Sequence, residues 1–151
     1  MLQDITKIAL KLLWVMGLLA LMLIAFQYQQ IIKQDFEATY NPLSTFWFHS
    51  IVPLLFGLYS SLLFIKNWSF KINIPLFLGV TCPLLILSFY SPVTYTIFLN
   101  IAPDPSSFSV PIPFWMFKIN SFEIVPIVAG LTLIVSLFGA NRQQSRHLTL
   151  Y

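Results

Sequence analysis

The sequence predicts an all-α transmembrane protein. We expect a four-helix membrane bundle with a small extracytoplasmic loop, β-like or extended, between helices 3 and 4. Two observations predict this class. Charged residues make up 9% of the 151-residue chain and hydrophobic residues 58%, whereas a soluble domain is about 25% charged. Four apolar runs also follow one another, separated by polar or proline-rich stretches. The length predicts a single integral membrane domain, 1–151.

The first apolar run begins after two lysines, Lys7 and Lys11. With its flanks, the segment 8–27 is long enough to cross a hydrocarbon core about 30 Å thick at about 1.5 Å per residue. A signal peptide starts in the same way, but no convincing small-residue cleavage site follows, so we expect a retained span. We interpret 27–40 as a short polar connection.

Three further runs predict three further spans. The second is 46–65, which ends before Lys66. The third is 72–90, and we expect Pro92 to stop it, because the residue before a proline is disfavoured in a helix. The fourth, 124–140, is shorter. These boundaries leave one long connection, 91–123, between the third and fourth spans.

The basic residues predict the orientation. Six of the eight Lys and Arg residues fall on one side of the four spans: Lys7, Lys11, Lys66, Lys71, Arg142 and Arg146. Cytoplasmic loops carry the excess of Lys and Arg in membrane proteins. We therefore expect cytoplasmic N- and C-termini in a bacterial plasma membrane, with the loop 91–123 outside.

The predicted outer loop, 91–123, is too rich in proline for a span and too aromatic for a disordered segment. Loops of this length are usually functional or disordered, so we expect an ordered functional face. Over 93–101, two sets of residues alternate: Val93, Tyr95, Ile97, Leu99 and Ile101 in one, and Thr94, Thr96, Phe98 and Asn100 in the other. This alternation is typical of a half-buried strand. The competing interpretation is a segment that lies flat in the headgroup layer, with Trp115 among the lipids.

Small residues recur at a spacing of four in the second and fourth spans. This spacing lets helix backbones approach closely, either within the bundle or against a partner protein. The predicted helix-packing residues are Gly57, Ser61, Thr132, Ser136 and Ala140.

Two prolines, Pro53 and Pro83, lie inside predicted spans, and each removes one backbone hydrogen bond. Two kinks at a similar depth would splay the helices and leave an outer-leaflet pocket near His49; alternatively, the prolines only bend the helices, and His49 is an ordinary interfacial residue. A histidine and a carboxylate can act as acid and base, but no spacing joins them here. The candidate ligand- or partner-binding residues are His49, Pro53, Pro83, Tyr90, Phe114, Trp115, Phe117 and Glu123.

Several functional classes are disfavoured. No ionisable residue lies near the centre of a predicted span, which argues against an ion-coupled transporter. The single cysteine, Cys82, excludes an intrachain disulfide and a cysteine-based zinc site, and a buried cysteine usually behaves as a small hydrophobe. No catalytic motif is present, and we expect no cofactor and no metal. The net charge of +3 is too small and scattered to predict nucleic acid.

Two functions remain. The first is a small multi-pass membrane protein that acts as a non-catalytic subunit or accessory protein. It would bind a membrane-protein partner, or a second copy of itself, through the outer loop and the small-residue helix faces. The alternative is a binder or enzyme for a lipid-like molecule, held in an outer-leaflet pocket near Pro53, Pro83 and His49.

Overall fold

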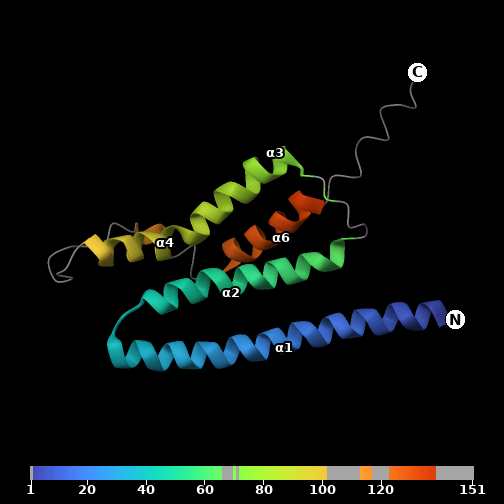
Figure 1. Cartoon of the computed structure of the whole chain (residues 1–151), viewed down its shortest axis with the longest axis horizontal. Coiled ribbons are helices and arrows are strands. Elements are labelled where there is room, and N and C mark those ends of the chain that lie inside the picture. The colour runs from blue at the N-terminus through green and yellow to red at the C-terminus, as the bar shows by residue number, and fades with distance from the viewer. Residues whose placement is uncertain (1, 66–69, 71, 102–112, 117–122, 139–151) are drawn as a thin grey trace, which may run out of the picture. The chain divides into compact units, whose positions relative to one another are not determined.

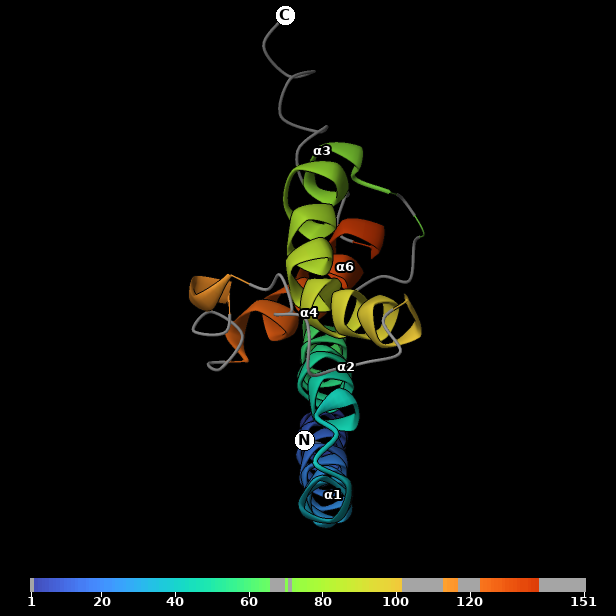
Figure 2. The same cartoon turned by 90° about the vertical axis from the view of Figure 1, so that its left-hand side faces the viewer.

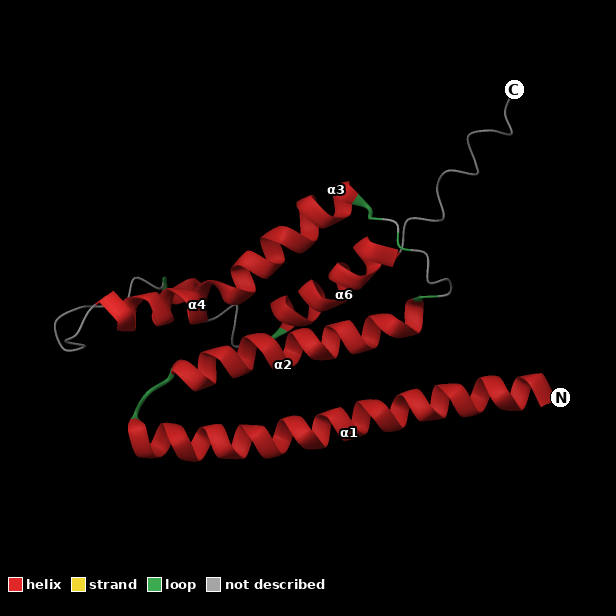
Figure 3. Ribbon diagram, in the orientation of Figure 1, coloured by secondary structure: helices red, strands yellow, loops and turns green. Residues whose placement is uncertain are grey.

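In a computed structural model, the chain is helical, and no strand occurs among the residues that the structure describes (Figure 3). These are residues 2–65, 70, 72–101, 113–116 and 123–138. Within these residues, three helices are long and apolar enough to cross a membrane, which indicates an integral membrane protein. The chain divides into two compact units, Met1–Pro42 and Leu43–Tyr151.

The first unit is one helix, α1 (Leu2–Thr39), of 38 residues (Figure 1). The predicted polar connection at 27–40 is therefore wrong, since helix continues to Thr39. Its sequence explains this: glutamine, lysine and glutamate are good helix formers, and the first proline after α1 begins is Pro42. At about 1.5 Å per residue, α1 is about 57 Å long, nearly twice the thickness of a hydrocarbon core of about 30 Å.

The end of α1 is a left-handed cap. Tyr40 has a φ of 54°, and its N–H donates to the carbonyl of Phe36 at 2.8 Å. This is the 5→1 bond of a helix that stops with one residue in the left-handed conformation. A glycine usually occupies that position. Tyr40 therefore holds a conformation that favours glycine.

In the described part of the second unit, three long helical segments pack together. The first is α2 (Leu43–Ser61), which is followed by a 3-10 turn, Leu62–Phe64. The second joins α3 (Ile74–Leu76), a π-helical segment (Phe77–Thr81) and α4 (Cys82–Ile101). The third is α6 (Ile124–Phe138). α6 packs against α2, α4 and the π-helical segment, and α2 also packs against α4. The packing of α1 as the fourth helix of this bundle stays a prediction.

α4 corrects the predicted end of the third span. Pro92 does not stop the helix, which runs through it to Ile101. Proline lacks an N–H, so the carbonyl of Ser88 loses its usual partner. The hydroxyl of Ser50 on α2 donates to that carbonyl at 2.8 Å. The lost bond is replaced from the neighbouring helix, and α4 can continue.

The predicted strand at 93–101 is wrong for the same reason, because these residues are the last turns of α4. Alternating β-branched residues are tolerated in a helix whose packing outweighs local propensity. The predicted loop 91–123 therefore contains helix up to Ile101. Residues 113–116 contain one further helical turn, at 114–116. The remaining parts, 102–112 and 117–122, lie outside the described residues.

Most buried residues in the described part of the second unit have small side chains. Its buried polar residues are Ser50, Ser61, Thr81, Ser88, Ser91 and Ser136. Large apolar residues such as Ile86 and Ile97 are more than half exposed. An arrangement with small polar residues inside and large apolar residues outside suits a bilayer. Lipid covers the apolar side chains there, and close approach of backbones holds the helices together.

Candidate functional site

The site lies at the end of the second unit where α2 begins, α4 ends and α6 begins, which we call the aromatic end (Figure 1). His49 projects from the second turn of α2, and Glu123 immediately precedes α6. His49 Nδ1 and Glu123 Oε1 form a short hydrogen bond. The two side chains are 39% and 40% exposed. The pair thus ties the start of α6 to α2 at a position that other molecules can reach.

Glu123 holds a strained backbone conformation, with a φ of 54°. A non-glycine residue in the left-handed region costs roughly 1–2 kcal/mol. Its carbonyl also accepts a bond of 3.5 Å from the N–H of Ile127, which starts the hydrogen-bond ladder of α6. Glu123 therefore both begins the helix and carries the carboxylate that meets His49.

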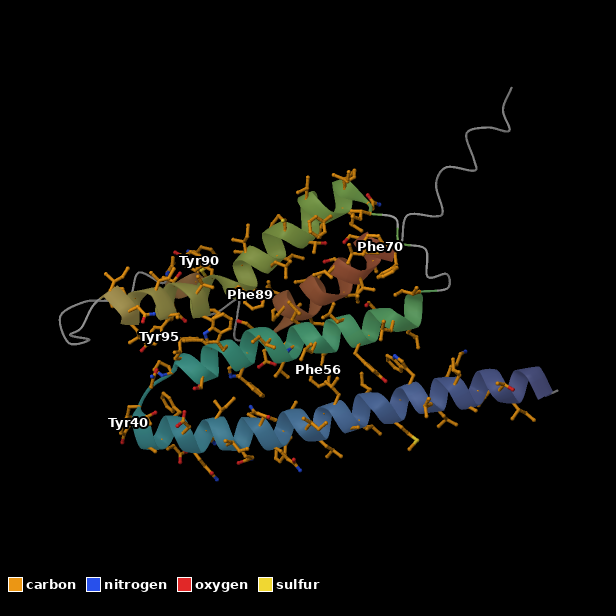
Figure 4. All side chains as sticks on the ribbon, viewed as in Figure 1. Tyr40, Phe56, Phe70, Phe89, Tyr90 and Tyr95 are labelled. Carbon is orange, nitrogen blue, oxygen red and sulfur yellow. The ribbon has the colours of Figure 1, made fainter. Side chains whose placement is uncertain are left out.

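Aromatic side chains form the layer beside this pair. The ring of Trp47 lies 6.1 Å from the ring of Phe89, and Phe46 lies 5.4 Å from Tyr95. In Figure 4, Phe89 and Tyr95 lie on the side of α4 that faces α2. Trp47 Nε1 donates to Thr96 Oγ1 at 3.2 Å. α2 and the last turns of α4 are therefore joined by two tilted ring contacts and a hydrogen bond.

The hydroxyl of Thr96 continues this contact into the backbone, since it donates to the carbonyl of Pro92 at 2.7 Å. Trp47 thus meets a hydroxyl that is already oriented by its own helix. Buried or half-buried tryptophan N–H groups usually have a partner of this kind. The arrangement accounts for Trp47 as a structural residue of the aromatic end.

Farther along α2 from the aromatic end, α2 and α6 cross in close contact at two glycines, Gly57 and Gly130. A Cβ on Gly57 would lie 2.0 Å from the carbonyl oxygen of Ile127, and a Cβ on Gly130 would lie 2.2 Å from the carbonyl oxygen of Leu54. Each helix thus presses its backbone against the other's glycine. Only glycine fits at either position without moving a helix.

The predicted packing residues lie around this crossing. Ser61 and Ser136 are completely buried, and each hydroxyl donates within its own helix, to Leu58 and Leu133 respectively. Thr132 is half-buried, and Ala140 lies outside the described residues. Sequence reasoning missed Gly130. The sequence signal for it was a pair of adjacent small residues, Ala129 and Gly130, seven and six residues before Ser136. The structure buries both of them.

The structure brings together two of the predicted ligand residues, His49 and Glu123. Pro53 is buried in α2, whereas Pro83 is exposed in the first turn of α4. Tyr90 is 37% exposed and lies on the side of α4 away from α2 (Figure 4). Phe114 and Trp115 are 75% and 54% exposed. Phe117 lies outside the described residues.

The chemistry available at the aromatic end is limited. A carboxylate that accepts a bond from one imidazole nitrogen fixes the tautomer and orients the ring. A metal would need further ligands, and no group of three His, Cys, Asp or Glu residues is close enough to hold one within the part of the chain that the structure describes. The pair can therefore bind a polar group or stabilise the helix ends.

No family model, no curated protein and no solved structure matches this chain.

Proposed function

We propose that the protein is a non-catalytic accessory subunit of the plasma membrane, which binds a partner protein through the part of α1 that extends beyond the bilayer. The observation that supports this most directly is the length of α1. The predicted span ends at about Gln27, but the helix continues for 12 further residues, to Thr39. At about 1.5 Å per residue, this extension, 28–39, is about 18 Å long.

One face of the extension is apolar. Tyr28, Ile31, Ile32 and Phe36 fall within an arc of about 140° when successive residues are placed about 100° apart. Tyr28 is 60% exposed, Ile31 59% and Phe36 39%. Gln30 and Gln34 lie on the opposite side of the helix by the same spacing. The extension is thus amphipathic, which is the pattern of a helix that packs against another surface.

Lipid is a poor match for this face. The face lies beyond the length of helix that a hydrocarbon core covers, and Asp35 falls among its apolar residues. A carboxylate is costly to place against acyl chains. A protein can present an apolar surface that contacts the apolar residues of this face, together with a lysine or arginine that pairs with Asp35. We therefore assign a partner with an apolar contact surface and a basic residue opposite Asp35.

The glycine crossing supports α1, and not the small-residue positions of α2 and α6, as the partner surface of this proposal. Gly57 and Ser61 are buried within the chain, as is Ser136. The burial of these three residues supports a role in packing α2 against α6, and the proposal therefore places the partner on α1. The basic residues predict the orientation of the chain in the membrane. With the termini in the cytoplasm, the extension of α1 lies outside.

Affinity purification of two matched double variants tests this proposal. Ile31→Ser with Phe36→Ser changes the apolar face, and Gln30→Ser with Gln34→Ser changes the opposite face with the same substituent. We expect the first variant to lose a protein that co-purifies with the wild type and the second to retain it. Equal recovery by both variants, with both inserted at wild-type levels, would contradict the proposal.

The His49–Glu123 hydrogen bond favours a second candidate, a site for a lipid-like ligand with a polar head. Both side chains are about two-fifths exposed, and an imidazole can donate to or accept from a headgroup. Native mass spectrometry of the wild type and of His49→Phe tests it. Specific lipid adducts that the variant lacks would support this candidate, and identical adduct patterns would rule it out.

A further inference from the structure

A short helical turn stands to one side of the second unit at the aromatic end. It comprises 114–116, and the N–H of Met116 donates to the carbonyl of Pro113 at 2.9 Å. Figure 2 shows this light-orange turn beside the packed helices, on the side opposite to the end of α4. The turn therefore projects sideways from the bundle.

The three side chains of the turn face different surroundings. Met116 is buried, with 6% of its surface exposed. Phe114 and Trp115 are 75% and 54% exposed. The turn thus combines one buried methionine with two large aromatic side chains that are mostly exposed.

The level of the turn points to the bilayer surface. α2 has 19 residues and is about 28 Å long at about 1.5 Å per residue, close to the thickness of a hydrocarbon core. Its first residues must then lie at a membrane boundary. In Figure 1 the turn lies toward this same end of the second unit, where Phe46 and Trp47 contact α4. Trp and Tyr concentrate at this level in membrane proteins.

We propose that Phe114 and Trp115 insert into the boundary between headgroups and acyl chains of the leaflet at the aromatic end, and that they form a lateral anchor for α6. α6 begins at Ile124, eight residues after Met116, so the turn lies close in the sequence to the first residues of this helix. Aromatic residues that flank a membrane helix help to set its position in the bilayer. The inference does not depend on the partner proposed for α1.

Depth-dependent fluorescence quenching tests the anchor. The protein is reconstituted with Trp115 as its single tryptophan, after replacement of the other three by phenylalanine: Trp14→Phe, Trp47→Phe and Trp68→Phe. Vesicles contain phosphatidylcholine with bromines either near the headgroup end of the acyl chains or near the bilayer centre. We expect a larger loss of fluorescence with the shallow bromines than with the deep ones. Stronger quenching by the deep bromines would overturn the proposed level, and no quenching by either would show that Trp115 faces water or protein.

A second measurement covers the case in which the triple replacement does not fold. A spin label is placed at Trp115→Cys in a Cys82→Ser background, and its collisions with oxygen and with a water-soluble nickel chelate are compared. Leu19→Cys in the middle of α1 and Gln34→Cys beyond its apolar run supply depth references. We expect the ratio of the two collision rates at 115 to lie between those at the references. A ratio equal to that of Gln34→Cys would overturn the anchor.

Discussion

Replacement of Gly57 by alanine adds one methyl group at the point where α2 and α6 touch. Its Cβ would lie 2.0 Å from the carbonyl oxygen of Ile127, 2.8 Å from the carbonyl carbon and 3.0 Å from the backbone nitrogen of Leu131. These are backbone atoms, so no side chain can rotate to make room. To restore ordinary contact at 3.4 Å, the oxygen must retreat by about 1.4 Å from its position at 2.0 Å, and α6 must move with it.

The expected loss of stability follows from two opposing terms. Overpacking typically costs about 1–3 kcal/mol, and a contact between two backbones belongs at the upper end. Alanine is favoured over glycine within a helix by about 1 kcal/mol. We therefore expect Gly57→Ala to lower the free energy of unfolding by about 2 kcal/mol. Gly57→Leu should be worse, and it should destabilise more than Leu63→Ala, because Leu63 is 53% exposed.

The matched control is Gly79→Ala. Apart from its chain neighbours and the backbone of its own helix, no heavy atom lies within 4 Å of a Cβ at Gly79. Only the gain in helix propensity therefore applies, and stability should rise or stay the same. Reversible unfolding in one detergent, followed by circular dichroism, measures both variants. The reciprocal variant Gly130→Ala should resemble Gly57→Ala, and the double variant should cost less than the sum, because the helices have already separated. Equal stability of Gly57→Ala and Gly79→Ala would refute the close crossing.

Three further predictions concern the helix ends and the topology. Ser50→Ala should lower the free energy of unfolding by about 1–2 kcal/mol, because it leaves the carbonyl of Ser88 unsatisfied; the loss should shrink in a Pro92→Ala background, and an equal loss in both backgrounds would contradict the replacement bond. Hydrogen exchange should become slower in the last turn of α1 in Tyr40→Gly and faster in Tyr40→Val, because glycine adopts a positive φ at little cost; the reverse order would show that the cap is not strained. A cysteine label at the N-terminus or at Arg146→Cys should be inaccessible from outside intact cells, and labelling of either from outside would reverse the orientation.

The broad class could be predicted because it depends on composition. Long apolar runs have few structures open to them in a bilayer, and helix is the simplest. The length of α1 could not be predicted in the same way. The polarity of Gln27 and its neighbours indicates where the membrane ends, whereas helix propensity and the cap at Tyr40 decide where the helix ends. Those two boundaries lie 12 residues apart.

The errors at α4 and at the site arise from contacts between distant residues. Pro92 would be expected to end an isolated helix, but its effect is offset by Ser50, 38 residues before the carbonyl that it contacts. His49 and Glu123 are 74 residues apart, and no local spacing connects them. Both were candidates by residue type and by predicted level at the membrane surface. Their hydrogen bond follows only from the packing of α6 on α2.

Site-specific photocrosslinking on the extension of α1 tests the central claim most directly. A photoreactive phenylalanine analogue replaces Phe36 on the apolar face, or Gln34 on the opposite face, in cells that express the full chain. By the helical spacing these two positions lie about 160° apart. The account predicts a crosslink to another protein from Phe36 and little or none from Gln34. Crosslinks from Phe36 only to lipid or to the chain itself, or equal crosslinks from both positions, would contradict it.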